Sequence, residues 1–143
     1  MPKVDAAAAL GRYKALNAAQ REGLVRSCHD LSDGGLAVAA AESAFAGGFG
    51  LSLDLSRVLW KGETANKSDV ALLFSESASR HLVTVRPEKR DEFESIMGGN
   101  CFASIGVVTE EPILSVTGLA GATVIRAGLD ELKEAWQKTL RDL

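Results

Sequence analysis

Residues 32–35, Ser-Asp-Gly-Gly, separate two segments of opposite character, and this junction constrains the fold more than any other stretch of the chain. The preceding run, residues 24–31 (LVRSCHDL), has the length of a β-strand and is bounded by turn residues. The following run begins near Gly34, is rich in alanine and ends at Gly47 and Gly48, as helices commonly do. The sequence therefore predicts a strand that leads through a tight turn into a helix.

In the rest of the chain, segments with the apolar spacing of helices are interspersed with segments that have the alternation of strands. Apolar spacing, early acidic residues and terminal glycines predict further helices over residues 4–21, 87–99 and 128–140. Alternation and turn residues predict strands over residues 49–55, 80–87, 101–111 and 113–127, the last interrupted by a turn. Residues 70–77 (VALLFSES) fit a short helix or a strand, and residues 56–69 are expected to form the longest loop. This mixture predicts an α+β fold, with helices packed on a mixed or antiparallel sheet.

Composition excludes several classes of protein. The 143 residues, 46% hydrophobic and 6% aromatic, suit one globular domain with an aliphatic core. A net charge of -3 argues against nucleic-acid binding, which requires a basic surface. The sequence has no secretion signal and no apolar run long enough for a membrane span, so a cytoplasmic protein without a membrane partner is expected. Cys28 and Cys101 match no disulfide or metal-binding spacing and are expected to be reduced, buried thiols.

The glycine junction combines groups that suit a phosphate and a divalent cation. Unpaired backbone N–H groups at the start of a helix would form an anion site over Ser32, Asp33, Gly34 and Gly35, which glycine leaves open to close approach. Asp30, at the end of the strand, would add a hard oxygen ligand for a Mg²⁺ that bridges phosphate oxygens. The alternative is structural: Ser32 or Asp33 caps the helix, and the two glycines form a tight turn.

Other polar and aromatic residues have structural interpretations. His29 is expected to be a hydrogen-bonded strand residue rather than a ligand or a base. Glu76 and Arg80 are four residues apart, which predicts an ion pair on one helix. Trp136 is expected to pack in the core or at its rim, and an interface with another domain is the alternative.

Residues 29–36 (HDLSDGGL), followed by Ala37-Val38-Ala39, Glu42 and Gly47-Gly48, resemble the C-terminal domain of phosphoribosylformylglycinamidine synthase, an enzyme of purine biosynthesis. The later segments LLFSES, LVTV, ASIGVV and ELKEAWQKTL look like that domain in the same order. The resemblance implies one domain over residues 1–143, with a leading helix at 1–22 and the synthetase-related part at 23–143. It also implies a three-layer α/β/α arrangement like the C-terminal domain of aminoimidazole ribonucleotide synthetase.

The resemblance implies part of an ATP-dependent C–N ligase. The family converts formylglycinamide ribonucleotide, glutamine-derived ammonia and ATP to formylglycinamidine ribonucleotide, with ATP activating the amide oxygen. By position, Asp30 matches the acid that ligates Mg²⁺, Ser32 matches the hydroxyl that contacts the nucleotide, and Gly34 and Gly35 complete the loop. Mg²⁺ and ATP are therefore the implied cofactors. Ala78 stands where an earlier tandem copy of the domain carries glutamine, which favours a nucleotide retained for structural reasons over direct substrate binding.

The resemblance also implies partners. The catalytic histidine and the ATP-binding lysine of the family lie in other domains, so no catalytic residue is assigned here. The chain is expected to be an inactive C-terminal fragment alone, and to act with the remaining synthetase domains and with glutaminase and small bridging subunits. Two alternatives stay open. One is a standalone interaction or regulatory module that retains the fold, and the other is a selenophosphate synthetase or hydrogenase-maturation homologue.

Overall fold

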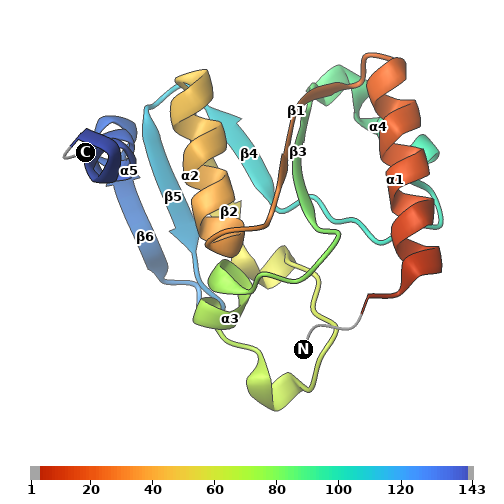
Figure 1. Ribbon diagram of the computed structural model, residues 1–143, viewed down its shortest axis with the longest axis horizontal. Helices are drawn as coiled ribbons and strands as arrows, with labels where there is room; N and C mark the ends of the chain where they lie inside the picture. The colour runs from red at the N-terminus through yellow and green to blue at the C-terminus, as the bar shows by residue number, and fades with distance from the viewer. Residues whose placement is uncertain (1–3, 142–143) are drawn as a thin grey trace.

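The computed structural model describes residues 4–141, with side chains up to residue 138. Its strands form two sheets (Figure 1). Strands β1 (Val25–Asp30) and β3 (His81–Val85) form an antiparallel ribbon. The larger sheet is mixed, because β2 runs parallel to β5 and antiparallel to β4. Its order across the sheet is β4 (Gly106–Thr109), β2 (Gly50–Asp54), β5 (Ile113–Thr117) and β6 (Thr123–Gly128).

Helices lie on both sides of the β1–β3 ribbon (Figure 1). On one side, α2 (Gly35–Gly47) contacts both sheets and packs beside α5 (Leu129–Arg141). On the other side, α1 (Ala6–Arg21) packs on α4 (Arg90–Met97). The short helix α3 (Asp69–Phe74) contacts α2 near the bottom of the view in Figure 1. The predicted α+β architecture, with helices on mixed and antiparallel strands, is confirmed.

The main core lies between α2 and the larger sheet. Alanine predominates on the buried face of α2, and such small side chains let the strands approach the helix closely. The sheet contributes leucine and valine from alternate positions of β2 and β5, namely Leu51, Leu53, Leu114 and Val116. These four face α2 because side chains two apart on a strand point to the same face. Helix α1 contributes no residue to this core cluster and buries its apolar residues elsewhere, among them Ala9 and Leu16.

Several local predictions can be compared with the structure. The ambiguous segment at residues 70–77 is helical only to Phe74. The predicted loop contains two short 3₁₀ turns, Leu55–Arg57 and Thr64–Asn66, and a third, Pro87–Lys89, leads into α4. The expectation of buried thiols is wrong, because both free cysteines are exposed. Cys28 lies on a ribbon of only two strands, and Cys101 lies in the connection between α4 and β4.

No helix within residues 4–141 combines the length and the apolar character required to cross a lipid bilayer.

Gly35, at the start of α2, packs against the backbone at the end of α3. It adopts a left-handed conformation, with φ of +64°. A Cβ atom at this position would lie 2.8 Å from the carbonyl oxygen of Leu73 and 2.9 Å from that of Ser75. Glycine is therefore required here both by the backbone conformation and by the close approach of another backbone.

We expect Gly35→Ala to lower the free energy of unfolding by about 3 kcal/mol, because the new methyl group adds a collision with fixed backbone to the left-handed strain. Gly23→Ala is the matched control, since Gly23 also has a positive φ but an added Cβ would meet nothing within 4 Å. Its expected cost is about 1 kcal/mol. Urea unfolding of the variants measures both costs, and equal losses would contradict the collision.

Candidate functional site

A shallow hollow of about 210 Å³ lies where β1 ends and β3 begins. Antiparallel pairing sets Asp30 opposite His81, so the segments that continue from these two strand ends lie side by side. One wall comes from residues 30–32 and the other from residues 76–81. The lining residues are Asp30, Leu31, Ser32, Glu76, Ser77, Ala78, Ser79, Arg80 and His81.

The structure places the four predicted site residues in two groups. Asp30 and Ser32 line the hollow together. Gly34 and Gly35 do not line it, and they form the start of α2. The two glycines thus shape the turn, while Asp30 and Ser32 offer their side chains to the hollow.

The start of α2 is capped by a residue that the sequence analysis did not assign to it. Gly34 is the N-cap, with φ of +73°, and its N–H donates to Oε1 of Glu76 at 2.9 Å. The prediction that Ser32 or Asp33 caps this helix is therefore wrong. A left-handed glycine at the cap position has no side chain to offer, so a carboxylate 42 residues later in the sequence takes that role.

Glu76 does not form the predicted ion pair with Arg80. Helix α3 ends at Phe74 and Ser79 has φ of +60°, so residues 76 and 80 do not lie one turn apart on a helix. Arg80 instead donates to the backbone carbonyl of Ser75 at 3.0 Å. The predicted intrahelical pair is wrong because the helix stops before it.

Asp30 is available as an oxygen ligand. Its side chain is 63% exposed. The Ser32 hydroxyl, which donates to the carboxylate, holds the pKa of Asp30 below its usual range, and the nearby rings of His29 and His81 act in the same direction. The carboxylate is consequently charged at neutral pH, which a hard cation requires.

The oxygen ligands of the hollow suit only one of the coordination modes that are usual for Mg²⁺. Within residues 4–141 no three His, Cys, Asp or Glu side chains gather closely enough to hold a metal ion. Mg²⁺ is often bound by one or two carboxylates, with phosphate oxygens and water completing the shell. Asp30 suits that mode and does not suit a closed site made by this chain alone.

The other wall of the hollow carries positive charge. Arg80 is partly buried, and burial lowers the pKa of its guanidinium, which still stays charged because arginine does not deprotonate in proteins. Burial also lowers the pKa of His81, an effect that the charge of Arg12 strengthens and that Asp30 opposes. His81 is thus mainly neutral at pH 7, and Arg80 is the cation of the hollow.

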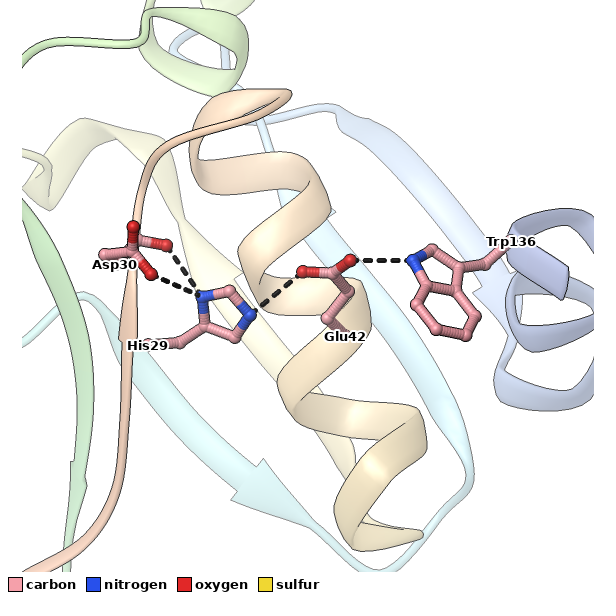
Figure 2. A network of polar contacts seen from close by, with 4 residues as sticks. All are labelled: His29, Asp30, Glu42 and Trp136. Carbon is pink, nitrogen blue, oxygen red and sulfur yellow. Dashed lines mark hydrogen bonds and ion pairs between the residues drawn. The ribbon is translucent and has the colours of Figure 1, made fainter. Parts of the chain in front are cut away.

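A polar network that begins beside Asp30 connects β1, α2 and α5 (Figure 2). The Nε2 atom of His29 lies 2.9 Å from Oε2 of Glu42, and Nδ1 lies 2.7 Å from the backbone oxygen of Asp30. Trp136 donates from Nε1 to Oε1 of Glu42 at 2.8 Å. Both ring nitrogens of His29 thus lie within hydrogen-bonding distance of an oxygen acceptor.

These contacts confirm that His29 is a hydrogen-bonded strand residue. Trp136 is 50% exposed, which places it at the rim of the core, with its ring 5.7 Å from that of Phe45. The contacts of Glu42 with His29 and Trp136, and of Glu76 with Gly34, were not predicted. Local spacing contains no sign of either contact, since the partners come from separate elements.

Comparison with known proteins gives a consistent result. Residues 2–118 match the family described as AIR synthase related protein, C-terminal domain. The chain is 39% identical over 127 residues to phosphoribosylformylglycinamidine synthase subunit PurL of Lactobacillus helveticus (strain DPC 4571), a match that covers 89% of this chain and 15% of that protein. The chain thus corresponds to a small part of the relative's length.

Solved structures agree with this match. The chain resembles T. maritima PurL complexed with FGAR, with a TM-score of 0.80 and 26% identity, over 92% of this chain and 22% of that one. For T. maritima PurL complexed with ATP the TM-score is 0.75 and the identity 27%, over 85% and 21% of the two chains. E. coli HypE, at 19% identity and a TM-score of 0.67 over 81% and 39%, shares the fold.

Ser32→Ala is expected to raise the pKa of Asp30, because it removes the hydroxyl that favours the ionised carboxylate. A carboxyl with a depressed folded-state pKa stabilises the fold above its unfolded pKa and loses that contribution as pH falls through its folded pKa. Carbon NMR of the carboxyl, titrated from about pH 7 to about pH 2, measures the shift. Ser56→Ala, which removes the equivalent donor from Asp54, should leave Asp30 unchanged. An unshifted Asp30 in Ser32→Ala would refute the assignment.

We expect Glu42→Gln to lower the free energy of unfolding by about 1–2 kcal/mol, since an amide has one acceptor oxygen where the carboxylate serves two donors. One of His29 and Trp136 then faces the amide NH2 group instead of a carboxylate oxygen. Glu94→Gln is the control, because its pair with Arg90 is exposed and screened by solvent, so its loss should cost much less. Urea unfolding followed by tryptophan fluorescence measures both, and similar losses would contradict a special role for Glu42.

Proposed function

The chain belongs to the family of AIR synthase related proteins, as their C-terminal domain, and from this premise we propose that it is the C-terminal domain of a phosphoribosylformylglycinamidine synthase. In this proposal residues 1–143 form a single domain of an ATP-dependent ligase of de novo purine biosynthesis. The domain contributes half of a nucleotide- and Mg²⁺-binding site and no catalytic residue, so the isolated chain is inactive. The cytoplasmic location predicted from the sequence is part of the proposal.

The observation that carries the proposal is the meeting of Asp30, Ser32 and Arg80 in one hollow. An ionised carboxylate for a cation and a guanidinium for an anion are the complementary groups that a metal–phosphate ligand requires. The relatives support this ligand class, since T. maritima PurL has been solved in complex with ATP, with ADP and with AMPPCP.

Each residue has a definable part in this half-site. Asp30 would hold Mg²⁺, which when bound would neutralise phosphate charge. Ser32 orients the Asp30 carboxylate by donating to it. Arg80 supplies a fixed positive charge on the facing wall. The N–H of Gly34 becomes available to an anion only if Glu76, its present acceptor, withdraws.

The remaining half of the site would come from other polypeptide segments. The hollow is open and the metal ligands of the described residues are too few to enclose a cation. We therefore assign the missing ligands to the other synthetase domains. Glutaminase and small bridging subunits are the further partners, by analogy with the PurLQS structure of T. maritima.

One observation favours a second candidate, a non-catalytic interaction or regulatory module that retained the fold. The carboxylate of Glu76 already occupies the N–H of Gly34, where a bound phosphate would be expected. A domain that had lost its ligand would benefit from such an internal acceptor, because it gives this backbone donor a fixed partner within the chain.

A chimera distinguishes the two candidates. The chain replaces the matching region of L. helveticus PurL, and Mg²⁺-ATP is titrated calorimetrically into the chimera and into the isolated chain. We expect binding by the chimera only, with Asp30→Asn weakening one class of nucleotide site on the order of tenfold or more.

Asp33→Asn is the matched control, because Asp33 is exposed in the same turn but does not line the hollow. It should bind as the unaltered chimera does. Tight binding by the isolated chain that is independent of Asp30 would refute the half-site. A folded chimera that lacks the Asp30-dependent site would support the non-catalytic module.

A further inference from the structure

We propose that Arg12, on α1, is a positioning residue for the proposed half-site: its guanidinium holds Ser79 and thereby fixes the rim segment, residues 75–80, around the hollow. The biological meaning of this inference rests on the proposed function. The link between Arg12 and the rim segment can be tested without nucleotide.

The rim segment determines the shape of the hollow. It lies between the end of α3 at Phe74 and the start of β3 at His81, and it forms no helix or strand of its own. Yet it supplies most of one wall, from Glu76 to Arg80. A wall without regular backbone hydrogen bonds depends on individual contacts to keep its conformation.

Besides the bond from Ser75 N–H back to Ala71 in α3, three hydrogen bonds attach the rim segment to other parts of the chain. The carbonyl of Arg80 accepts from the N–H of Leu31 at 3.1 Å, and Glu76 accepts from Gly34. The third contact reaches across 67 residues of sequence: Nη2 of Arg12 donates to the hydroxyl of Ser79 at 2.8 Å. The first two attach the rim to residues 31 and 34, at the turn between β1 and α2, and the third attaches it to α1.

Ser79 is the point at which such a contact has most effect. Within residues 4–141 it is the single non-glycine residue with positive φ, at +60°. This conformation is unfavourable for serine and persists only where surrounding contacts hold it. The side chain that Arg12 contacts is therefore the one whose backbone most requires holding.

Arg12 is not explained as a surface charge or as part of an ion pair. Its Nε atom is buried and has no hydrogen-bond partner. No acidic side chain among the described residues forms an ion pair with it. An incompletely paired, partly buried cation destabilises a fold, so its position points to a role at the hollow.

The neighbouring residue on α1 contacts the same end of β3. Tyr13 packs edge-on against His81, with ring centroids 5.7 Å apart. The charge of Arg12 also acts on His81, which lines the hollow, by lowering its pKa. Since α1 lies outside the main core cluster, Arg12 and Tyr13 give this helix a direct connection to the candidate site.

Hydrogen exchange of the 143-residue chain tests the link. We expect Arg12→Met to speed rim exchange, meaning exchange of the Leu31 and Gly34 amides that donate to the rim segment, by roughly tenfold, the effect of losing one hydrogen bond from a charged donor. Arg12→Lys, which keeps a charged donor, should restore part of the protection. Ser79→Ala should match Arg12→Met, and the double variant should add nothing, because both remove the same contact.

Arg21→Met is the matched control, an exposed arginine on the same helix, and it should exchange like the unaltered chain. Unchanged rim exchange in Arg12→Met, or additive effects in the double variant, would overturn the inference. If Arg12→Met fails to fold, Ser79→Ala leaves α1 intact and decides the question alone.

Mg²⁺-ATP titration of the PurL chimera then connects the rim to the half-site. Arg12→Met should weaken the Asp30-dependent site about tenfold, with partial recovery in Arg12→Lys. A chimera that never binds at this site refutes the proposed function, while the exchange result stands. Unweakened binding by Arg12→Met, despite faster rim exchange, overturns the assignment of Arg12 to the half-site.

Discussion

The close contact between the start of α2 and the backbone that ends α3 is the constraint on which the candidate site depends. Only a glycine at position 35 lets the two backbones approach so closely. That approach brings Gly34 within hydrogen-bonding distance of Glu76 and places the two walls of the hollow opposite each other. The direct effect of the glycine turn is therefore the packing of two backbones. This packing in turn positions the side chains that line the hollow.

The elements of the fold were largely predictable because their signals are local. Alternation in β2, the alanine-rich run of α2 and the glycine at its end are properties of neighbouring residues. The division of the strands into two sheets was not predicted, since strand pairing such as that of β1 with β3 joins distant segments. The exposure of Cys28 follows from that division, because a ribbon of two strands leaves much of its surface open.

The candidate site was predictable in its residue types and less so in its contacts. Asp30 and Ser32 do meet in one hollow, as their adjacency suggested, and their ligands remain a proposal. The roles of Glu76 and Arg12 depend on partners 42 and 67 residues away, so sequence spacing gave no indication of them. The four-residue spacing of Glu76 and Arg80 was misleading, because it has meaning only inside a helix.

The Glu76–Gly34 bond also makes the carboxylate an internal substitute for a ligand. Because Glu76 satisfies the donor at the start of α2, the domain does not need a ligand to complete this hydrogen bond. An anion that reaches the same donor must first displace a covalently tethered competitor of like charge. The apparent affinity of such an anion is reduced by the free energy needed to displace Glu76. Binding and release of the anion would then exchange one acceptor of the Gly34 N–H, the anion, for the other, Glu76.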